Sequence, residues 1–426
     1  MLPSSQTQGP MALPVHKPLA SAQEVAALKE DEAAVARQLV KDFPESFNSL
    51  RIMGNLCFRH GNASEALKFW KSALRINPKQ ADVCASMGWA FLKKGEFEEA
   101  ITQYRKALEI EPQRPEMQAN IGRALMMSGR HDEAIEALRK EIQISPDSAF
   151  AYFLLGQIYQ QQKDYEKASD NYEMAIKIEP RYTNAYYGLA TVFAKLGQSD
   201  SAKEHSATFR KLKAEGRKHL KGRKLQYDDF SETQKRAAIT YINAGRMYRD
   251  HGKLDKAEEL LKHAAGLDPQ NVVCFMELSS VFQAKRQPAK TLAMQKRIVE
   301  IQPTFRPGYL VIGILSTHLG QFGEAEKAFS KVITLGPQDS TGYRELARLY
   351  LKTRKKLPLA RQLAEKALAL EAIAGNYFVV GWACYENGDI PGAFKAVKRA
   401  IELDPDNTQY PLLYKQILQR KHSAPD

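Results

Sequence analysis

The sequence predicts an all-α protein built from stacked pairs of short helices, and three observations support this fold class. Closing prolines recur 34 residues apart, at Pro44, Pro78, Pro112, Pro146 and Pro180. Between successive prolines, apolar residues recur every three or four positions in two separate runs, which is the pattern of two amphipathic helices. A small residue in the first run and an alanine in the second recur in register. So small a pair of helices cannot bury its apolar faces alone, and neighbouring copies must therefore stack on one another.

Residues 81–112 show the unit most clearly, with the sequence ADVCASMGWAFLKKGEFEEAITQYRKALEIEP. Met87 and Phe91 lie on the apolar face of the first helix, and Tyr104 lies on that of the second. Gly95 separates the two runs, and Pro112 ends the second because proline has no amide proton. The first helix has a large residue, a Leu-like residue and Gly in that order, and the second helix has Ala-x-x-x-Tyr-x-x-Ala before the closing Pro. This unit resembles the tetratricopeptide repeat. The resemblance implies a solenoid of helix-turn-helix units wound as a right-handed superhelix.

The register of the first helices predicts ten repeats, five on each side of an insertion. Their signature pairs are Met53-Gly54, Met87-Gly88, Ile121-Gly122, Leu155-Gly156, Leu189-Ala190, Ala244-Gly245, Leu278-Ser279, Ile312-Gly313, Leu346-Ala347 and Val380-Gly381. The second-helix alanine follows 12 residues later in most repeats, but the seventh has Thr291 and the ninth has Ala360 one residue late. From Pro180 to Pro269 the spacing is 89 residues, two periods plus 21, so the extra residues must lie in one place.

In chain order, we expect a flexible tail (1–20), a leading partial repeat that covers the open end of the stack (21–44) and a first array of repeats one to five (45–206). A basic helical insertion (207–237) then joins a second array of repeats six to ten (238–407), and a C-terminal capping helix with a tail (408–426) follows. Gly216 and Gly222 each weaken a continuous helix by about 1 kcal/mol, so we expect the insertion to be a long or broken helix.

Composition favours a soluble helical protein, with 44% hydrophobic and 26% charged residues. An apolar run of about 18 residues is missing, so no transmembrane segment is expected. The N-terminal sequence lacks a basic start followed by an apolar core, which is the pattern of a secretory signal. We therefore expect a cytoplasmic protein by default, or a periplasmic or secreted one if a signal has been trimmed.

The net charge of +13 is concentrated in one segment, residues 210–224, which contributes +7. Its basic residues are Arg210, Lys211, Lys213, Arg217, Lys218, Lys221, Arg223 and Lys224. They form either a solvated hinge helix or a contact for an acidic partner, nucleic acid or an anionic membrane surface. Because no aromatic residue lies between Lys211 and Lys224, stacking of nucleic-acid bases has no platform there.

Catalytic and metal-binding motifs are missing from the sequence: there is no Gly-rich phosphate loop, no His-Glu-x-x-His and no Gly-x-Ser-x-Gly. The four cysteines have no metal-ligand spacing, and we expect them to be buried as small apolar residues. We expect no enzymatic activity, no catalytic residue, no cofactor and no metal.

The resemblance implies that the first helix of each repeat lines a concave groove, where an extended peptide or a partner helix binds. Helical spacing assigns to this groove Arg51, Asn55, Trp89, Asn120, Arg123, Met126, Met127, Phe150, Phe153, Gln157, Gln160, Asn184, Tyr187, Thr191, Arg344, Arg348, Phe378, Trp382 and Tyr385. Aromatic side chains supply contact area and amides bond a peptide backbone without reading its sequence. The alternative is that several of them, Phe153 and Tyr187 in particular, pack between adjacent repeats.

The peptide carboxylate clamp of the cochaperone members is not reproduced in repeats one to three. Arg51 and Asn55 match its first pair loosely, but Ser86 replaces an expected Asn, and Glu116 and Asn120 replace the expected Lys and Arg. A glutamate at this place would repel a carboxylate, so we reject the clamp here.

The asparagine ladder of the sugar-transferase members is missing as well. Successive equivalent positions hold Ile52, Ser86, Asn120, Leu154 and Gly188.

The sequence therefore predicts a non-enzymatic scaffold that binds a protein or peptide in its groove, with repeats three to five as the principal site. The partner's identity is left open. The alternatives are an adaptor to a polyanion (nucleic acid or an anionic membrane surface) through residues 210–224, and a regulatory subunit of an enzyme carried on another chain.

Overall fold

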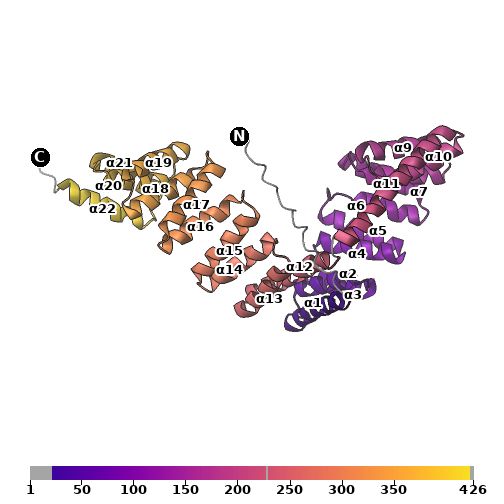
Figure 1. The fold of residues 1–426 in the computed structure, drawn as a ribbon, viewed down its shortest axis with the longest axis horizontal. Helices are drawn as coiled ribbons and strands as arrows, with labels where there is room; N and C mark the ends of the chain where they lie inside the picture. The colour runs from indigo at the N-terminus through magenta and orange to yellow at the C-terminus, as the bar shows by residue number, and fades with distance from the viewer. Residues whose placement is uncertain (1–21, 227–228, 423–426) are drawn as a thin grey trace, which may run out of the picture. The chain divides into compact units, whose positions relative to one another are not determined.

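The computed structural model describes residues 22–226 and 229–422, and side chains within residues 23–216 and 230–420. All 22 elements of this part of the chain are α-helices, so the protein is an all-α helical repeat. Figure 1 shows the two helices of each repeat side by side, and consecutive repeats in chain order within each unit. The predicted tails, residues 1–20 and the last four residues, lie outside the described residues.

Ten helix pairs lie between a leading helix, α1 (Ala22–Asp42), and a closing helix, α22 (Gln409–His422). The pairs of repeats one to five are α2 (Phe47–Arg59) and α3 (Ala63–Ile76), α4 (Ala81–Lys94) and α5 (Phe97–Ile110), α6 (Met117–Met127) and α7 (His131–Ile144), α8 (Ala149–Gln161) and α9 (Tyr165–Ile178), and α10 (Thr183–Lys195) and α11 (Ser199–Gln226). Those of repeats six to ten are α12 (Asp229–Asp250) and α13 (Leu254–Leu267), α14 (Val272–Ala284) and α15 (Pro288–Ile301), α16 (Arg306–His318) and α17 (Phe322–Leu335), α18 (Ser340–Thr353) and α19 (Leu357–Leu370), and α20 (Ala374–Glu386) and α21 (Ile390–Leu403).

Small residues at the signature positions let the paired helices approach closely, as the sequence predicts. A Cβ atom added at Gly88 on α4 would lie 2.7 Å from the ring of Tyr104 on α5. In the first unit the ring of Tyr172 lies between Gly156 and Gly188, which lie on the two neighbouring first helices. The interior of the solenoid therefore consists of large side chains packed onto bare backbone, an arrangement that tolerates little added volume.

The turn between the helices of a repeat needs one residue in the left-handed conformation. Gly95 ends α4 with φ 78°, which glycine adopts without steric cost. In the fourth repeat Lys163 takes the same place with φ 64°. A side chain in this conformation costs energy, so the turn geometry is imposed there by the packing of α8 on α9.

The described residues form two compact units, one ending at Ala244 and the other beginning at Gly245. This boundary falls inside α12, whereas the sequence predicts a junction at residues 207–237. The division into two arrays of five repeats at the insertion therefore stays a prediction. In the first unit, buried alanine, leucine and aromatic side chains form a cluster from Cys57 to Val192. In the second unit, buried apolar side chains form more than one cluster, including one around Leu292 and Ile312 and one from Ala325 to Ile417.

The insertion extends the second helix of the fifth repeat. α11 runs for 28 residues without interruption at Gly216 or Gly222, and α12 begins at Asp229. Arg181, before α10, forms an ion pair of 2.9 Å with Glu215 on α11. The prediction of a long or broken helix is thus met by two long helices, α11 and α12.

The N-terminal part of α12 packs against the leading helix of the first unit. The guanidinium group of Arg59 on α2 donates to the backbone oxygen of Arg236 (3.0 Å) and to the hydroxyl of Thr240 (2.8 Å). Glu32 on α1 is 3% exposed and accepts hydrogen bonds from Arg59 and Thr240. We expected α1 to cover an open end of the stack, but one of its faces is itself covered by residues 229–244 of α12.

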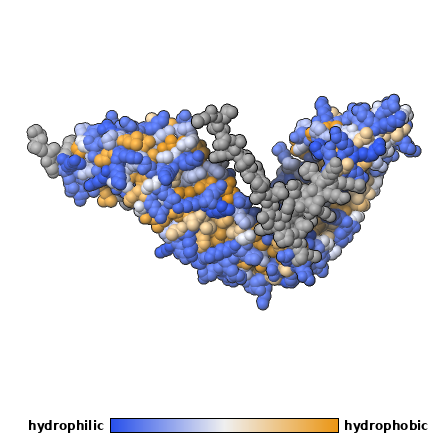
Figure 2. All heavy atoms as spheres, in the orientation of Figure 1, coloured by the Kyte–Doolittle hydropathy of each residue, from blue (hydrophilic) through white to orange (hydrophobic). Residues whose placement is uncertain are grey.

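Helix α22 packs on the last repeat through Leu413 and Ile417, which are buried. Leu412, on the same helix, is 66% exposed. No helix among the described residues is long and apolar enough to cross a membrane. On the face shown in Figure 2, hydrophilic residues cover much of the second unit and apolar residues lie between its helices.

Candidate functional site

A pocket on the first helices of repeats four and five brings together five of the predicted groove residues. It has a volume of about 390 Å³, and its lining comes from α8, α9 and α10. The lining residues are Phe153, Gln157, Gln160, Gln161, Tyr172, Asn184, Tyr187 and Gly188. We call this site the amide pocket, because four of these described side chains are amides and none carries a charge.

One amide of the pocket, that of Gln160, is held in place by a neighbouring side chain. The hydroxyl of Tyr172 donates to the Oε1 atom of Gln160 at 2.7 Å, which fixes the orientation of that amide and directs its NH₂ group as a donor. Burial raises the pKa of the Tyr172 hydroxyl, so it remains a protonated donor. Asn184 is exposed and Gln157 is half-buried.

Tyr187 gives the pocket an exposed aromatic wall. Its side chain is 60% exposed, and its ring centroid lies 5.3 Å from that of Phe209 on α11. The Nζ atom of Lys213 lies 5.0 Å from the centroid of Phe209. Thr191 donates to the backbone oxygen of Tyr187 at 2.9 Å, inside α10. Since the Tyr187 side chain is 60% exposed, most of it is open to a ligand.

Phe153 lines the same pocket, but its ring belongs mainly to the contact between repeats. It is 9% exposed, and its centroid lies 5.9 Å from that of Tyr172 and 5.1 Å from that of Tyr182. The sequence left open whether Phe153 and Tyr187 line the groove or pack between repeats. In the structure Phe153 is in the core and Tyr187 is on the surface.

The predicted groove residues of repeats one to three do not gather in the amide pocket, and several have partners within their own or the next repeat. Trp89 is half-buried, with the Arg123 guanidinium 5.3 Å and the Lys93 Nζ atom 5.8 Å from its ring centroid. Asn55 accepts a hydrogen bond of 2.9 Å from the indole of Trp70. Asn120 bonds the backbone oxygen of Glu116, Arg51 and Met126 are half-buried, and Met127 is 47% exposed. Phe150, from repeat four, is half-buried and does not line the amide pocket.

A second pocket lies on the first helices of repeats eight to ten, in the second unit. It has a volume of about 270 Å³ and is lined by Ile314, Thr317, His318, Phe329, Glu345, Arg348, Leu349, Lys352 and Trp382. We call it the cationic pocket. Arg348 and Trp382 are predicted groove residues, whereas sequence reasoning missed Lys352. One further helical turn from Arg348 would have found it.

Other predicted residues of the second unit contact the closing helix. The ring of Phe378 lies 4.9 Å from that of Tyr410, and the Arg420 guanidinium lies 5.1 Å from the Tyr385 centroid. Arg344 bonds Glu345 and lies 3.4 Å from the Oδ1 atom of Asn376. α22 therefore packs on α20, the first helix of the tenth repeat, and covers part of the rings of Phe378 and Tyr385.

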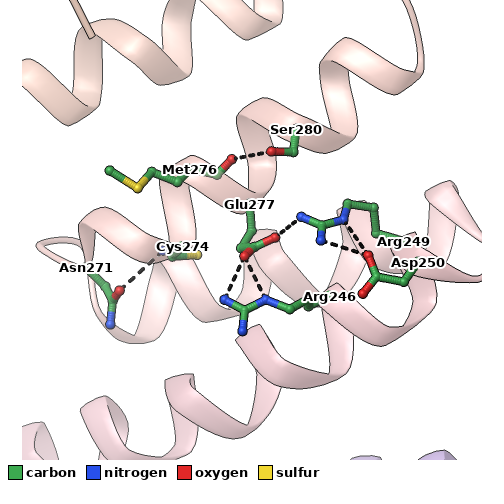
Figure 3. A network of polar contacts seen from close by, with 8 residues as sticks. All are labelled: Arg246, Arg249, Asp250, Asn271, Cys274, Met276, Glu277 and Ser280. Carbon is green, nitrogen blue, oxygen red and sulfur yellow. Dashed lines mark hydrogen bonds and ion pairs between the residues drawn. The ribbon is translucent and has the colours of Figure 1, made fainter. Parts of the chain in front are cut away.

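A buried carboxylate that the sequence analysis missed links repeats six and seven in the second unit (Figure 3). Glu277 on α14 accepts from the guanidinium groups of Arg246, at 2.8 Å, and Arg249, both on α12. Arg249 also bonds Asp250 at 2.7 Å. The Glu277 side chain is 11% exposed, so its charge is stabilised almost entirely by the two arginines.

The basic segment is described only in part. Arg210, Lys211 and Lys213 are exposed on α11. The side chains of Arg217, Lys218, Lys221, Arg223 and Lys224 lie outside the described residues, although the backbone there is helical.

All four cysteines are buried and unpaired, as predicted. Burial raises the pKa of Cys274 to about 12, so this thiol is not an ionised nucleophile. Within the described parts of the chain, no group of three His, Cys, Asp or Glu residues could hold a metal ion.

Family models described as tetratricopeptide repeats match residues 86–149, 149–182, 238–271 and 318–377. These matches lie on both sides of the insertion and agree with the helix pairs of the structure. The chain is a tetratricopeptide-repeat protein with multiple repeats along its length.

Distant similarity extends to parts of much longer proteins. The chain is 27% identical over 176 residues to the mouse Protein O-mannosyl-transferase TMTC1, covering 40% of this chain and 18% of that protein. It is 32% identical over 102 residues to the UDP-N-acetylglucosamine--peptide N-acetylglucosaminyltransferase of Giardia intestinalis, covering 24% of this chain and 7% of that one. The chain thus spans about a fifth or less of these relatives.

Solved structures of similar fold include MamA from Desulfovibrio magneticus RS-1, with 22% identity, 43% of this chain and 97% of that chain covered, and a TM-score of 0.36. Another is the yeast Tom70, with 13% identity, 88% and 96% covered, and a TM-score of 0.35.

Proposed function

We propose that this protein is a non-enzymatic interaction scaffold that binds an extended peptide or a partner helix in the concave groove of its repeats. In this proposal, two arrays of five repeats are joined by the basic helical segment 207–237. The observation that carries it is the amide pocket, where an exposed tyrosine lies beside hydrogen-bonding amides on a rigid helical surface.

The chemistry of the amide pocket suits a peptide backbone. Asn184 and Gln157 each offer both a donor and an acceptor, so they can bond the N–H and C=O groups of an extended chain whatever its side chains are. Tyr187 adds contact area with few rotamers to restrict. Because none of the described lining residues is charged, binding there should depend little on salt.

The experiment that tests this proposal uses peptides selected from a displayed random library on the full chain, with affinity measured by calorimetry. Tyr187→Ala combined with Asn184→Ala should weaken a selected peptide by at least about ten-fold, because both side chains lie at the pocket surface. The midpoint of thermal unfolding should move little. The control is Phe322→Ala, which removes a 40%-exposed aromatic from the second unit. Unchanged affinity of the selected peptide for the double variant would contradict the proposal for this pocket.

Phe153→Ala does not serve as a groove variant. Since Phe153 packs between Tyr172 and Tyr182, its truncation should destabilise the first unit by about 3 kcal/mol. Loss of binding in that variant would report unfolding rather than recognition.

A polyanion-binding adaptor is the second candidate, because Arg210, Lys211 and Lys213 are exposed on α11. Lys211→Glu with Lys213→Glu should then abolish binding of an oligonucleotide or of anionic vesicles, and wild-type affinity should fall steeply with salt. A flat salt response would exclude this adaptor role. A regulatory subunit of an enzyme on another chain is compatible with either surface, and the transferases similar to this chain motivate it.

A further inference from the structure

The cationic pocket has positive charge that its own chain does not neutralise. Arg348 on α18 is 45% exposed, and Lys352 lies one turn further along the same helix. The single acid of the lining is Glu345, which is 3.1 Å from Arg344 and 3.6 Å from Arg348. Among the described residues, no carboxylate lies within ion-pair distance of Lys352. An anionic group that enters this pocket would therefore meet the positive charge of Lys352, which the described carboxylates do not neutralise.

Apolar surface lies directly beside that charge. Ile314 on α16 is 37% exposed, and Trp382 on α20 is half-buried. Phe329 and Leu349 close the floor of the pocket and are buried. The indole nitrogen of Trp382 lies 3.4 Å from the Oε1 atom of Glu386, which orients the ring. The pocket thus combines a cationic rim with an apolar interior, a combination that fits an acidic residue next to an aliphatic one.

The same unit shows how its groove holds a carboxylate. Glu277 precedes Leu278 in the seventh repeat as Glu345 precedes Leu346 in the ninth, so the two acids occupy equivalent positions. Glu277 is held between Arg246 and Arg249, and both guanidinium groups form ion pairs with it (Figure 3). In the ninth repeat the corresponding acid is Glu345. Among the described residues it lies within ion-pair distance of Arg344 and Arg348 but not of Lys352. The two arrangements differ in where the cations lie: Arg246 and Arg249 are on the first helix of the repeat before that of Glu277, whereas Arg348 and Lys352 are on the same helix as Glu345. Both place two cationic side chains on a first helix of the second unit.

We propose that the cationic pocket binds an acidic segment of a partner protein, with a carboxylate or phosphate group held by Arg348 and Lys352 and an adjacent aliphatic side chain against Trp382. This inference deepens the proposed scaffold function and rests on it. It assigns different ligands to the two pockets: an uncharged extended backbone to the amide pocket and an acidic, partly apolar segment to the cationic pocket.

The test measures fluorescence anisotropy of a labelled peptide with the repeating sequence Leu-Glu-Glu, its glutamine counterpart and a phosphoserine counterpart, each with the full chain. The glutamate and phosphoserine peptides should bind at least about ten-fold more tightly than the glutamine peptide. Arg348→Glu with Lys352→Glu should remove this preference, and Trp382→Leu should weaken both anionic peptides. Lys327→Glu reverses an exposed charge on α17 outside the pocket and should change nothing.

Equal binding of all three peptides, or an anionic preference that survives the double variant, would overturn the inference. Displacement of the peptide by an equal concentration of an oligothymidylate would show that the pocket takes nucleic acid instead of protein. Tyr187→Ala with Asn184→Ala separates the two proposals: this variant should retain the acidic peptide while losing the ligand of the amide pocket. A chain that binds neither class of peptide contradicts the scaffold function itself.

Discussion

The grooves of the two units are built from the same repeat yet differ in the charge they present. In the first unit, the amide pocket has four amides, exposed Tyr187 and no charged lining residue. In the second, the cationic pocket has Arg348, Lys352 and a single acid around an apolar floor. The difference shows that the first helix of a repeat carries two independent sets of positions. One set packs against the second helix. The other set lines the pockets and, in our proposal, determines which kind of ligand each pocket binds.

Packing positions are nearly interchangeable between the units. Gly88 packs on Tyr104 in the first unit as Gly313 packs on Phe329 in the second. The buried carboxylates differ more. Glu141 in the first unit accepts from the backbone amides of Glu116 (2.9 Å) and Ala119 (3.2 Å), whereas Glu277 in the second accepts from arginines. Glu141 and Glu277 are thus held by different kinds of donor, although Glu32 in the first unit also accepts from an arginine, Arg59.

The largest expected effect tests whether the units unfold independently. Gly156→Ala places a Cβ atom 2.6 Å from the Tyr172 ring, and Gly313→Ala places one 2.4 Å from the Phe329 ring. Each should destabilise its own unit by about 2 to 3 kcal/mol through overpacking. Urea unfolding followed by circular dichroism should show a shift of one transition in each variant. Gly216→Ala, with no atom within 4 Å of the added carbon, serves as the control and should not destabilise the chain. Equal shifts of a single transition in both variants would show that the chain unfolds as one unit.

A smaller effect separates the two kinds of buried carboxylate. Glu277→Gln should cost about 2 kcal/mol, because it leaves Arg246 and Arg249 without their shared counter-ion. Glu141→Gln should cost about 1 kcal/mol, because the amide oxygen still accepts one of the two backbone bonds. Stability measured at low and high salt should show that only the Glu277 loss shrinks with added salt. Identical salt responses would contradict the assignment of the two charges to different donors.

The pH dependence of the second unit should depend on Glu258. Hydrogen bonds from Lys262 and Lys285 lower its pKa from the usual 4.5 to about 2. A carboxylate whose pKa is lowered on folding stabilises the protein above its unfolded pKa, and the contribution disappears as pH falls through the folded pKa. Glu258→Gln should therefore cost about 1 kcal/mol at pH 7 and close to nothing near pH 2. Parallel stability curves from pH 7 to pH 2 would contradict this pairing.

The smallest expected effect is a difference between the two pockets in how peptide affinity depends on salt. Raising salt from about 50 to about 200 mM should weaken an acidic peptide at the cationic pocket by about three-fold through charge screening. The same change should leave a peptide selected on the amide pocket unaffected. Anisotropy titrations of both peptides on one protein sample provide the measurement. A salt-sensitive ligand at the amide pocket would mean that α11, through Lys213 beside Phe209, takes part in binding there.

The sequence predicted much of the amide pocket, because helical spacing places Gln157, Gln160, Asn184 and Tyr187 on one face of their helices. It could not separate Phe153 from Tyr187, since both are aromatics five positions into a first helix. Burial depends on what the neighbouring side chains present, and here the ring of Tyr182 lies against Phe153, which is buried, while Tyr187 lies beside Phe209 and stays 60% exposed. Lys352 was missed although it lies one helical turn beyond Arg348, where the same helical spacing would have found it. The Glu277 network was missed because ion pairs between helices of successive repeats leave no periodic signal in the chain.

By itself, the sequence determined the helix pairs, their 34-residue step, the turn glycines and the buried faces. These depend on contacts within a repeat or between successive repeats, and each such contact leaves a pattern at short spacing. Only the tertiary structure decided that residues 229–244 of α12 pack on α1 through Glu32, Arg59 and Thr240. Only the tertiary structure decided, too, that α22 covers Phe378. Glu32 and Thr240 are 208 residues apart, and no local periodicity records a contact that the folded chain makes once.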